Sequence, residues 1–338
     1  MIKPRYIFLS IAACIVVSLG SCVGNTPTVE TPPNPAVTQA SNHSSHSSKS
    51  KININSAILS ELDKFEAKLG VPALSNKIQA SRPYGSPEDL VTKKVITQAQ
   101  FDQIKDMVTI EEIVLTGEAK DVDYMTKLAL MKGHLFVAQE LLEQNQPKQA
   151  EPHIGHPVEE IYVDVEDQLN ERKVKEFKSD LISLTNLVKS NPKDSKIKDN
   201  FTISVQAVDN AIAALPTEQR AKPEFVLQVI NGLLDAANAE YSAAIANGKI
   251  TEPIEYQDSR GFVVYSSQLY KSISSQMAQN PEAHKAIDTA LTDLLTAWPS
   301  SIPPAQAVKT PEDVNKLVTV IQENTQKVIA SANTKAKS

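Results

Sequence analysis

Cysteine, aromatic residues and excess charge are all scarce in this chain of 338 residues. Two positions are cysteine, aromatic residues make up 5%, and the formal net charge is -6. Proteins specialised for nucleic acid or for membrane surfaces usually carry a strong basic patch or an aromatic platform. The composition therefore argues against either specialisation for the chain as a whole.

Catalytic signatures are also missing. The sequence shows no nucleophile paired with a base, and the metalloprotease pattern His-Glu-x-x-His does not occur. We therefore expect a binding protein rather than an enzyme, with a metal-dependent activity as the residual alternative.

The N-terminal apolar run, residues 6–19, is shorter than the roughly 20 residues that a membrane-spanning helix needs. It follows Lys3 and Arg5, an order typical of an export signal. The run ends in Leu19-Gly20-Ser21-Cys22, which resembles the bacterial lipobox, where the cysteine is acylated and becomes the new N-terminus. The resemblance implies a signal peptide over residues 1–21, palmitate or similar acyl chains on Cys22, and a lipid bilayer as partner.

The residue after Cys22 also bears on location. It is Val23, where aspartate would signal retention at an inner membrane. The lipobox resemblance therefore implies an exported protein at the outer membrane or cell surface, facing the periplasm or the exterior. Since Cys14 would leave with the signal peptide and Cys22 would carry lipid, we expect no disulfide in the mature chain.

Residues 22–50 follow the lipobox as a polar segment. After the cysteine they are mainly Thr, Pro, Asn, Ser and His. Such a stretch buries too little apolar surface to offset its ordering entropy. We predict a disordered tether, roughly 30 Å in r.m.s. length if it behaves as a flexible coil.

From residue 51 onward the apolar residues recur at spacings of three and four, and the alternation typical of strands is absent. Leu128, Met131 and Leu135 follow one such helical face. Ser86-Pro87-Glu88-Asp89 and Thr310-Pro311-Glu312-Asp313 are typical of helix starts. We predict an all-α protein with two folded units, residues 51–110 and 118–330.

The first unit carries three local patterns: Asn55 as the expected N-cap of the first helix, the turn Gly70-Val71-Pro72-Ala73-Leu74, and the linker Tyr84-Gly85-Ser86-Pro87-Glu88-Asp89-Leu90. Together they resemble the tandem helix-hairpin-helix module of the bacterial competence DNA receptor and of the photosystem II extrinsic U subunit. The resemblance implies docking of DNA or of a protein partner. The residues expected to carry this docking are Gly70, Val71, Ala73, Lys77, Arg82, Lys93 and Lys94.

The choice between DNA and protein turns on the hairpin turns and on charge. DNA-binding hairpins use Gly-hydrophobe-Gly so that bare backbone amides can approach a phosphate. Here Pro72 follows Val71, and Val95-Ile96-Thr97 replaces the second pair of glycines. Residues 51–110 hold eight Lys/Arg against seven Asp/Glu, which gives no basic footprint. Protein docking is therefore at least as well supported as DNA binding.

The second unit contains a repeat of helix rhythm. Helices expected over residues 121–146 and 223–247 are each followed by a turn and a Glu-Pro pair, Glu151-Pro152 and Glu252-Pro253. We predict a tandem four-helix bundle, with halves at about 118–216 and 222–330.

Polar residues cluster after the turn in each half. The first half has His153, His156, Glu159 and Glu160, with His134 facing the core from the preceding helix. The second half has Glu255, Asp258 and Arg260. Imidazole and carboxylate groups at such spacing suit a transition-metal site. Equally, the glutamates are first-turn acids favoured by the helix dipole, and His134 fits a hydrogen-bonded core histidine.

His156-Pro157-Val158-Glu159 supplies a His-x-x-Glu sequence, with Gly155 directly before it. It resembles the Gly-x-His-x-x-Glu signature of the imelysin family, a double helical bundle of bacterial iron-uptake lipoproteins, with the glycine displaced by one position. The resemblance implies a metal ion such as iron. Two functions follow: a membrane-anchored binding lipoprotein that docks protein or DNA through residues 51–110, with the bundle as a second binding platform, or a metal-handling lipoprotein in which the bundle is the active part.

Overall fold

A computed structural model describes residues 51–111 and 115–335. The predicted signal peptide, lipidated Cys22 and tether lie outside these residues. The described chain is helical apart from two short strand pairs, so the predicted all-α class is confirmed.

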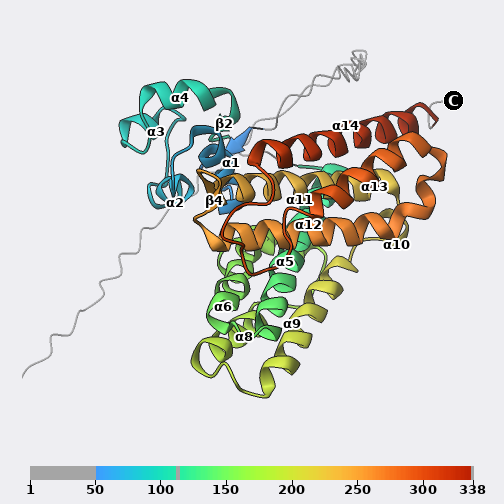
Figure 1. Cartoon of the computed structure of the whole chain (residues 1–338), viewed down its shortest axis with the longest axis horizontal. Coiled ribbons are helices and arrows are strands. Elements are labelled where there is room, and N and C mark those ends of the chain that lie inside the picture. The colour runs from blue at the N-terminus through green and yellow to red at the C-terminus, as the bar shows by residue number, and fades with distance from the viewer. Residues whose placement is uncertain (1–50, 112–114, 336–338) are drawn as a thin grey trace, which may run out of the picture. The chain divides into compact units, whose positions relative to one another are not determined.

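The first helical group (blue to teal in Figure 1) is bracketed by a parallel pairing of β1 (Ile52–Asn53) with β2 (Val108–Thr109). Between these strands lie α1 (Leu59–Leu69), α2 (Leu74–Ala80), α3 (Asp89–Thr92), α4 (Gln98–Ile104) and the 3-10 turn η1 (Lys105–Met107). The helices share a small apolar core that includes Leu62, Phe65 and Phe101.

The start of α1 differs from the sequence prediction, and its end lies at the predicted turn. Asn55 is not an N-cap, because its side-chain amide pairs with the backbone of Tyr84, accepting from the Tyr84 N–H at 2.7 Å and donating to its carbonyl at 2.9 Å. The N-cap of α1 is Ile58 instead. Gly70 ends α1 in the left-handed conformation, with φ of 60°, a common conformation at a helix C-terminus.

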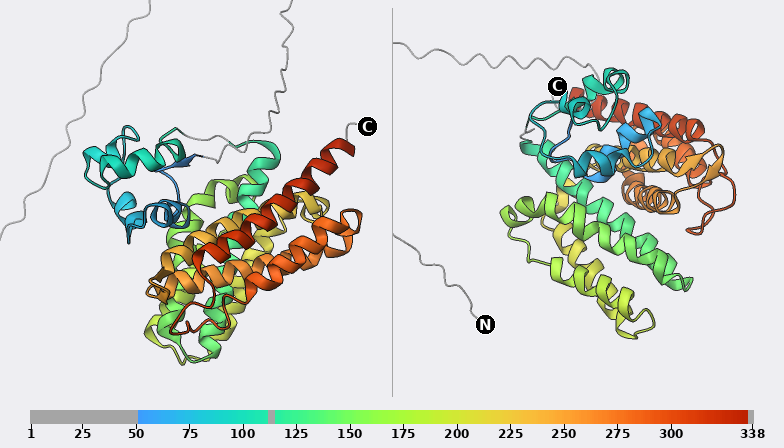
Figure 2. Two further views of the ribbon diagram at one scale, coloured as in Figure 1. Left: turned by 45° about the horizontal axis from the view of Figure 1, so that its top comes forward. Right: turned by 90° about the vertical axis from the view of Figure 1, so that its left-hand side faces the viewer.

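Most of the remaining helices form two groups in which four helical segments pack around a common centre, here called the first and the second ring (Figures 1 and 2). The first ring contains α5 (Gly117–Glu143), α6 (Pro147–His156) with its continuations η2 (Pro157–Tyr162) and α7 (Val163–Glu171), α8 (Lys178–Ser190) and α9 (Lys196–Ile212). After the short α10 (Thr217–Arg220), the second ring contains α11 (Pro223–Ala244), α12 (Pro253–Ile273), α13 (Pro281–Leu295) and α14 (Pro311–Lys335). The 3-10 turn η3 (Ser274–Gln279) joins α12 to α13.

A single apolar core runs through both rings, because α5 packs against both α11 and α12. It includes Leu128, Met131 and Leu135, as their spacing predicts. Helix α1 also packs against α11, and its N-cap residue Ile58 belongs to this core. No helix within residues 51–111 and 115–335 is long and apolar enough to cross a membrane.

Helix α11 ends at Ala244, three residues before the predicted end. Asn247 and Gly248 take positive φ values of 52° and 73° and turn the chain into a hairpin of β3 (Ile245–Ala246) and β4 (Lys249–Ile250). Asn-Gly is the favoured sequence for such a two-residue turn. The local turn preference therefore overrides the apolar periodicity.

Candidate metal centre

Four side chains from three helical segments converge inside the bundle. They are His134 of α5, His153 and His156 of α6, and Asp258 of α12. One nitrogen or oxygen from each lies within 4.8 Å of those of the others. His134, His153 and Asp258 are buried, while the side chain of His156 retains 27% exposure.

Asp258 is the common partner of the three imidazoles. Its Oδ1 lies 2.6 Å from Nδ1 of His134 and 2.6 Å from Nδ1 of His153, and its Oδ2 lies 3.3 Å from Nδ1 of His156. A carboxylate oxygen only accepts hydrogen bonds. Separations this short therefore require a proton on each facing nitrogen, or a cation among the four groups.

Electrostatics at the centre follow from burial and from this single anion. Burial raises the pKa of Asp258, but the charges and hydrogen bonds of His134 and His153 outweigh it and hold that pKa well below its usual range. Burial dominates at His134 and lowers its pKa. At His156 burial also acts to lower the pKa, yet the hydrogen bond and charge of Asp258 raise it to about 9.

The two histidines of α6 are three residues apart, a spacing that places their side chains on the same side of a helix, and α6 ends directly after His156. Pro157 has no N–H to donate, so the regular i to i-4 pattern cannot continue through it. The chain widens into the π-helical turn η2 and then resumes as α7. Such π-helical turns inside helices often occur at functional sites.

The other sequence-predicted residues of this region lie around the four side chains. Glu159 is exposed and is not one of the converging groups. Glu160 is partly buried, and burial raises its pKa to about 7 although the charge of His156 opposes the shift. Arg260 donates two hydrogen bonds of 2.7 and 2.8 Å to the Glu140 carboxylate and one of 2.7 Å to the Trp298 carbonyl. Its guanidinium group therefore links α12 to α5 and to the residues after α13.

A second group of carboxyls lies close by, where α1 meets α11. Asp63 and Glu240 are both buried and hydrogen-bonded to each other. Burial, with the nearby Glu66 and Glu255, raises the pKa of Asp63 to about 7, and burial with Asp63 raises that of Glu240 well above its usual value. Burial also raises the pKa of Glu255, the remaining member of the predicted second-half cluster.

The residues predicted to contact DNA or a partner lie along the first helical group, and several are engaged within it. Arg82 donates to the carbonyls of Ile54 and Ala57 at 2.7 and 2.5 Å, and Lys93 donates to the carbonyls of Ser81 and Pro83 at 2.8 and 2.5 Å. Lys77 and Lys94 are exposed, and Val71 is half-buried. Ala73 and Lys94 have a positive backbone φ.

The hairpin turn between α1 and α2 already holds an anion. The carboxylate of Glu66 accepts from the backbone N–H of Ala73 at 2.8 Å and of Leu74 at 2.9 Å, and from the Ser75 hydroxyl at 3.2 Å. These are the amides that a DNA phosphate would need. In this hairpin the chain's own carboxylate fills the position, which weighs against phosphate binding there.

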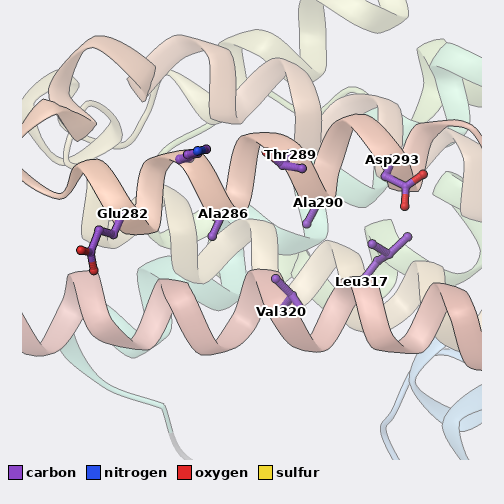
Figure 3. Close-up of a pocket in the computed structure, with 8 residues that line it drawn as sticks. Glu282, Ala286, Thr289, Ala290, Asp293, Leu317 and Val320 are labelled. Atoms are coloured by element: carbon purple, nitrogen blue, oxygen red, sulfur yellow. The ribbon is translucent and has the colours of Figure 1, made fainter.

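A separate groove of about 500 Å³ runs between α13 and α14. Figure 3 shows Ala286 and Ala290 of α13 facing Leu317 and Val320 of α14 across it. Glu282 and Asp293 stand along the same helix as the alanines. None of the four converging side chains lines this groove.

The comparisons with known proteins bear on the second ring of helices. A family model described as the iron permease-associated 4-helix bundle domain matches residues 216–332, roughly a third of the chain. The second half is therefore similar to a four-helix bundle domain associated with iron permeases. Comparison with curated proteins and with solved structures gives no significant match. The resemblances to the helix-hairpin-helix and imelysin families stay predictions.

The matched segment contains Asp258 but none of the three histidines. The centre thus joins the matched half to the half before it. The sequence patterns placed Asp258 in a cluster separate from the histidines. They did not single out Gln257, whose Oε1 lies 2.9 Å from Nε2 of His153, or Gly133 and Gly261, at which α5 and α12 approach each other closely. The two glycines could have been noticed from the sequence, because a glycine inside an otherwise regular helix often marks a close packing contact.

Proposed function

We propose that this protein binds a divalent transition-metal ion between the two rings of helices, with His134, His153, His156 and Asp258 as ligands. The observation that carries the proposal is the convergence of these four donors within 4.8 Å in a largely buried place. Three imidazoles packed around one carboxylate would otherwise hold several protons in mutual repulsion, a cost that one divalent ion removes.

The donor set selects a class of ion. Imidazole suits Fe, Ni, Cu and Zn, whereas Mg²⁺ and Ca²⁺ prefer oxygen ligands. Metal–nitrogen bonds of about 2.0–2.1 Å would place tetrahedral donors roughly 3.3 Å apart, so the oxygen and nitrogens now at 2.6 Å would separate slightly on binding. The bound ion takes the place of protons on the ring nitrogens.

Iron is the ion we favour as cargo. The similarity of residues 216–332 to an iron permease-associated domain supports a role in iron handling. The 27% exposure of His156 gives the ion a route to solvent, which suits capture and release better than a permanent structural role. We propose a binding protein without enzymatic activity.

The proposal includes location and partners. The N-terminal sequence up to Cys22 supports an exported, lipid-anchored protein at the outer membrane or cell surface. Residues 51–110 would act as an adaptor for a protein partner, since Glu66 fills the hairpin position that DNA would need. Mass measurement of the mature protein tests the anchor: acyl chains should be present on the wild type and absent after Cys22→Ala.

Metal titration of the purified protein tests the centre. We expect one equivalent of Fe²⁺ under anaerobic conditions, or of Zn²⁺ or Co²⁺, to bind in competition with a chelator, while excess Mg²⁺ does not displace it. Replacing a ligand, as in His153→Ala or Asp258→Ala, should weaken binding by at least about 100-fold, because a buried ligand is lost outright.

His284→Gln is the matched control. Nδ1 of His284 is hydrogen-bonded to the Tyr270 hydroxyl at 2.6 Å, and His284 lies outside the four-residue group. This variant should therefore bind the metal ion like the wild type. The predicted tether contains two histidines, His43 and His46. Unchanged affinity in His153→Ala, with loss only when these two are replaced, would assign the ion to the N-terminal segment and refute the proposed centre.

A further inference from the structure

Gln257 contacts the centre without being one of its four donor groups. It follows Tyr256 on α12 and is buried, and its Oε1 lies 2.9 Å from Nε2 of His153. This is the ring nitrogen on the side away from Asp258, since Nδ1 faces that carboxylate at 2.6 Å. His153 is therefore held from both ends of its ring.

The orientation of the Gln257 amide is decided by its other partners. Its Nε2 donates to the backbone carbonyl of Ser301 at 3.0 Å and to Oε1 of Gln149 at 2.8 Å. A backbone carbonyl only accepts, so the NH₂ group must face Ser301 and the oxygen must face His153. The oxygen in turn can only accept, which requires a hydrogen on Nε2 of His153.

The Ser301 carbonyl is itself held in place by α12. Trp298 donates its indole N–H to the Ser259 hydroxyl at 2.8 Å, Arg260 donates to the Trp298 carbonyl, and the Tyr256 hydroxyl donates to the Ser300 carbonyl at 3.2 Å. Gln144 of α5 donates to the Ser301 hydroxyl at 2.8 Å. The segment after α13 thus presents a fixed acceptor to Gln257.

We propose that Gln257 is a positioning residue that keeps the hydrogen of His153 on Nε2 and thereby reserves Nδ1 for the metal ion. The inference rests on the proposed metal-binding function and names a residue that tunes it. A ligating histidine whose second nitrogen donates to a fixed acceptor keeps its orientation and gains basicity, and loss of that acceptor typically costs about 10–100-fold in affinity.

Zinc titration and imidazole NMR of the ¹⁵N-labelled protein test the inference, because Zn²⁺ is diamagnetic. In the wild type the Nε2–H of His153 should be observed as a slowly exchanging proton, with and without Zn²⁺. Gln257→Leu should weaken Zn²⁺ binding by about 10–100-fold and make that proton exchange rapidly. Gln257→Glu should keep wild-type affinity or exceed it, because the carboxylate still accepts from Nε2–H.

Gln149→Ala is the matched control, since the Ser301 carbonyl still orients Gln257, and its Zn²⁺ affinity should stay within about threefold of the wild type. Equal affinity and an unchanged Nε2–H signal in Gln257→Leu would overturn the inference while leaving the metal site intact. Absence of Zn²⁺ binding in the wild type would instead refute the proposed function, and the metal-free NMR signal would still report on the hydrogen bond.

Discussion

Gly261 of α12 lies directly against the backbone of Gly133 of α5. A Cβ placed on Gly261 would stand 2.3 Å from the carbonyl oxygen of Gly133, and one placed on Gly133 would stand 2.6 Å from the ring of Phe262. The two helices therefore cross backbone to backbone. This close approach brings His134, the residue after Gly133, to Asp258, one turn before Gly261.

The crossing predicts that Gly261→Ala damages the centre without touching a ligand. The added methyl must push α5 away from α12, because the opposing atom is backbone and cannot rotate aside. We expect a loss of about 1–3 kcal/mol in the free energy of unfolding, the usual cost of overpacking, and weaker Zn²⁺ binding. Urea unfolding of the metal-free protein and chelator competition measure the two effects.

Gly155→Ala provides the matched control inside the same bundle. Gly155 lies in α6 with nothing within 4 Å of an added Cβ. Alanine favours a helix interior over glycine by about 0.5–1 kcal/mol, so this variant should be as stable as the wild type or slightly more so. A Gly261→Ala protein that behaves like Gly155→Ala would contradict the proposed role of the crossing.

In the metal-free protein, substitution of Asp258 should lower the stability more than substitution of any other residue of the centre. Since its pKa lies well below its usual range, the carboxylate contributes stability above about pH 4, the ordinary range of an aspartate, and that contribution is lost as the pH falls. Removing one partner of a buried charged group costs about 3–5 kcal/mol. Asp258→Asn should therefore unfold at lower urea concentration at pH 7, with a difference from the wild type that shrinks under acidic conditions.

Much of the fold could be predicted from local patterns. Thr310 accepts from the Asp313 N–H at 3.2 Å and α14 begins at Pro311, as the helix-start sequence indicates. The spacing of apolar residues around His134 likewise places its side chain in the core, where it is 4% exposed. Caps and helical faces depend on neighbours within one or two turns, so the sequence alone contains them.

Local patterns could not predict which residues come together at the metal centre. Asp258 lies more than a hundred residues from His134, and their contact depends on the crossing of α5 and α12. A glycine inside a helix is compatible with a close crossing but does not name the partner. The end of α11 was predicted three residues too late for the opposite reason, since the apolar periodicity outweighed the local turn signal of Asn247 and Gly248.

The Glu66 carboxylate should stabilise α2 and keep the hairpin turn closed to phosphate. Glu66→Ala removes the acceptor for the Ala73 and Leu74 amides, so we expect a loss of about 1 kcal/mol, as for other helix caps. In a gel-shift titration at low salt the wild type should show no DNA binding. Salt-sensitive binding by Glu66→Ala alone would show that the carboxylate blocks the turn, whereas binding by the wild type would favour the DNA alternative.

The buried pair of Asp63 and Glu240 should make the protein less stable as the pH rises. An acid whose pKa is higher in the folded than in the unfolded chain releases its proton more readily when unfolded, so unfolding is favoured between the two values. For Asp63 that interval runs from 3.8 to about 7. Glu66 and Glu255 add negative charge around the pair.

Asp63→Asn removes one of the two titrating groups while keeping the side chain's shape. The variant should gain about 1–3 kcal/mol over the wild type at pH 8 and lose most of the decline between pH 4 and pH 7. Urea unfolding at a series of pH values measures both effects. Parallel curves for the wild type and Asp63→Asn would show that this carboxyl pair does not control the pH dependence.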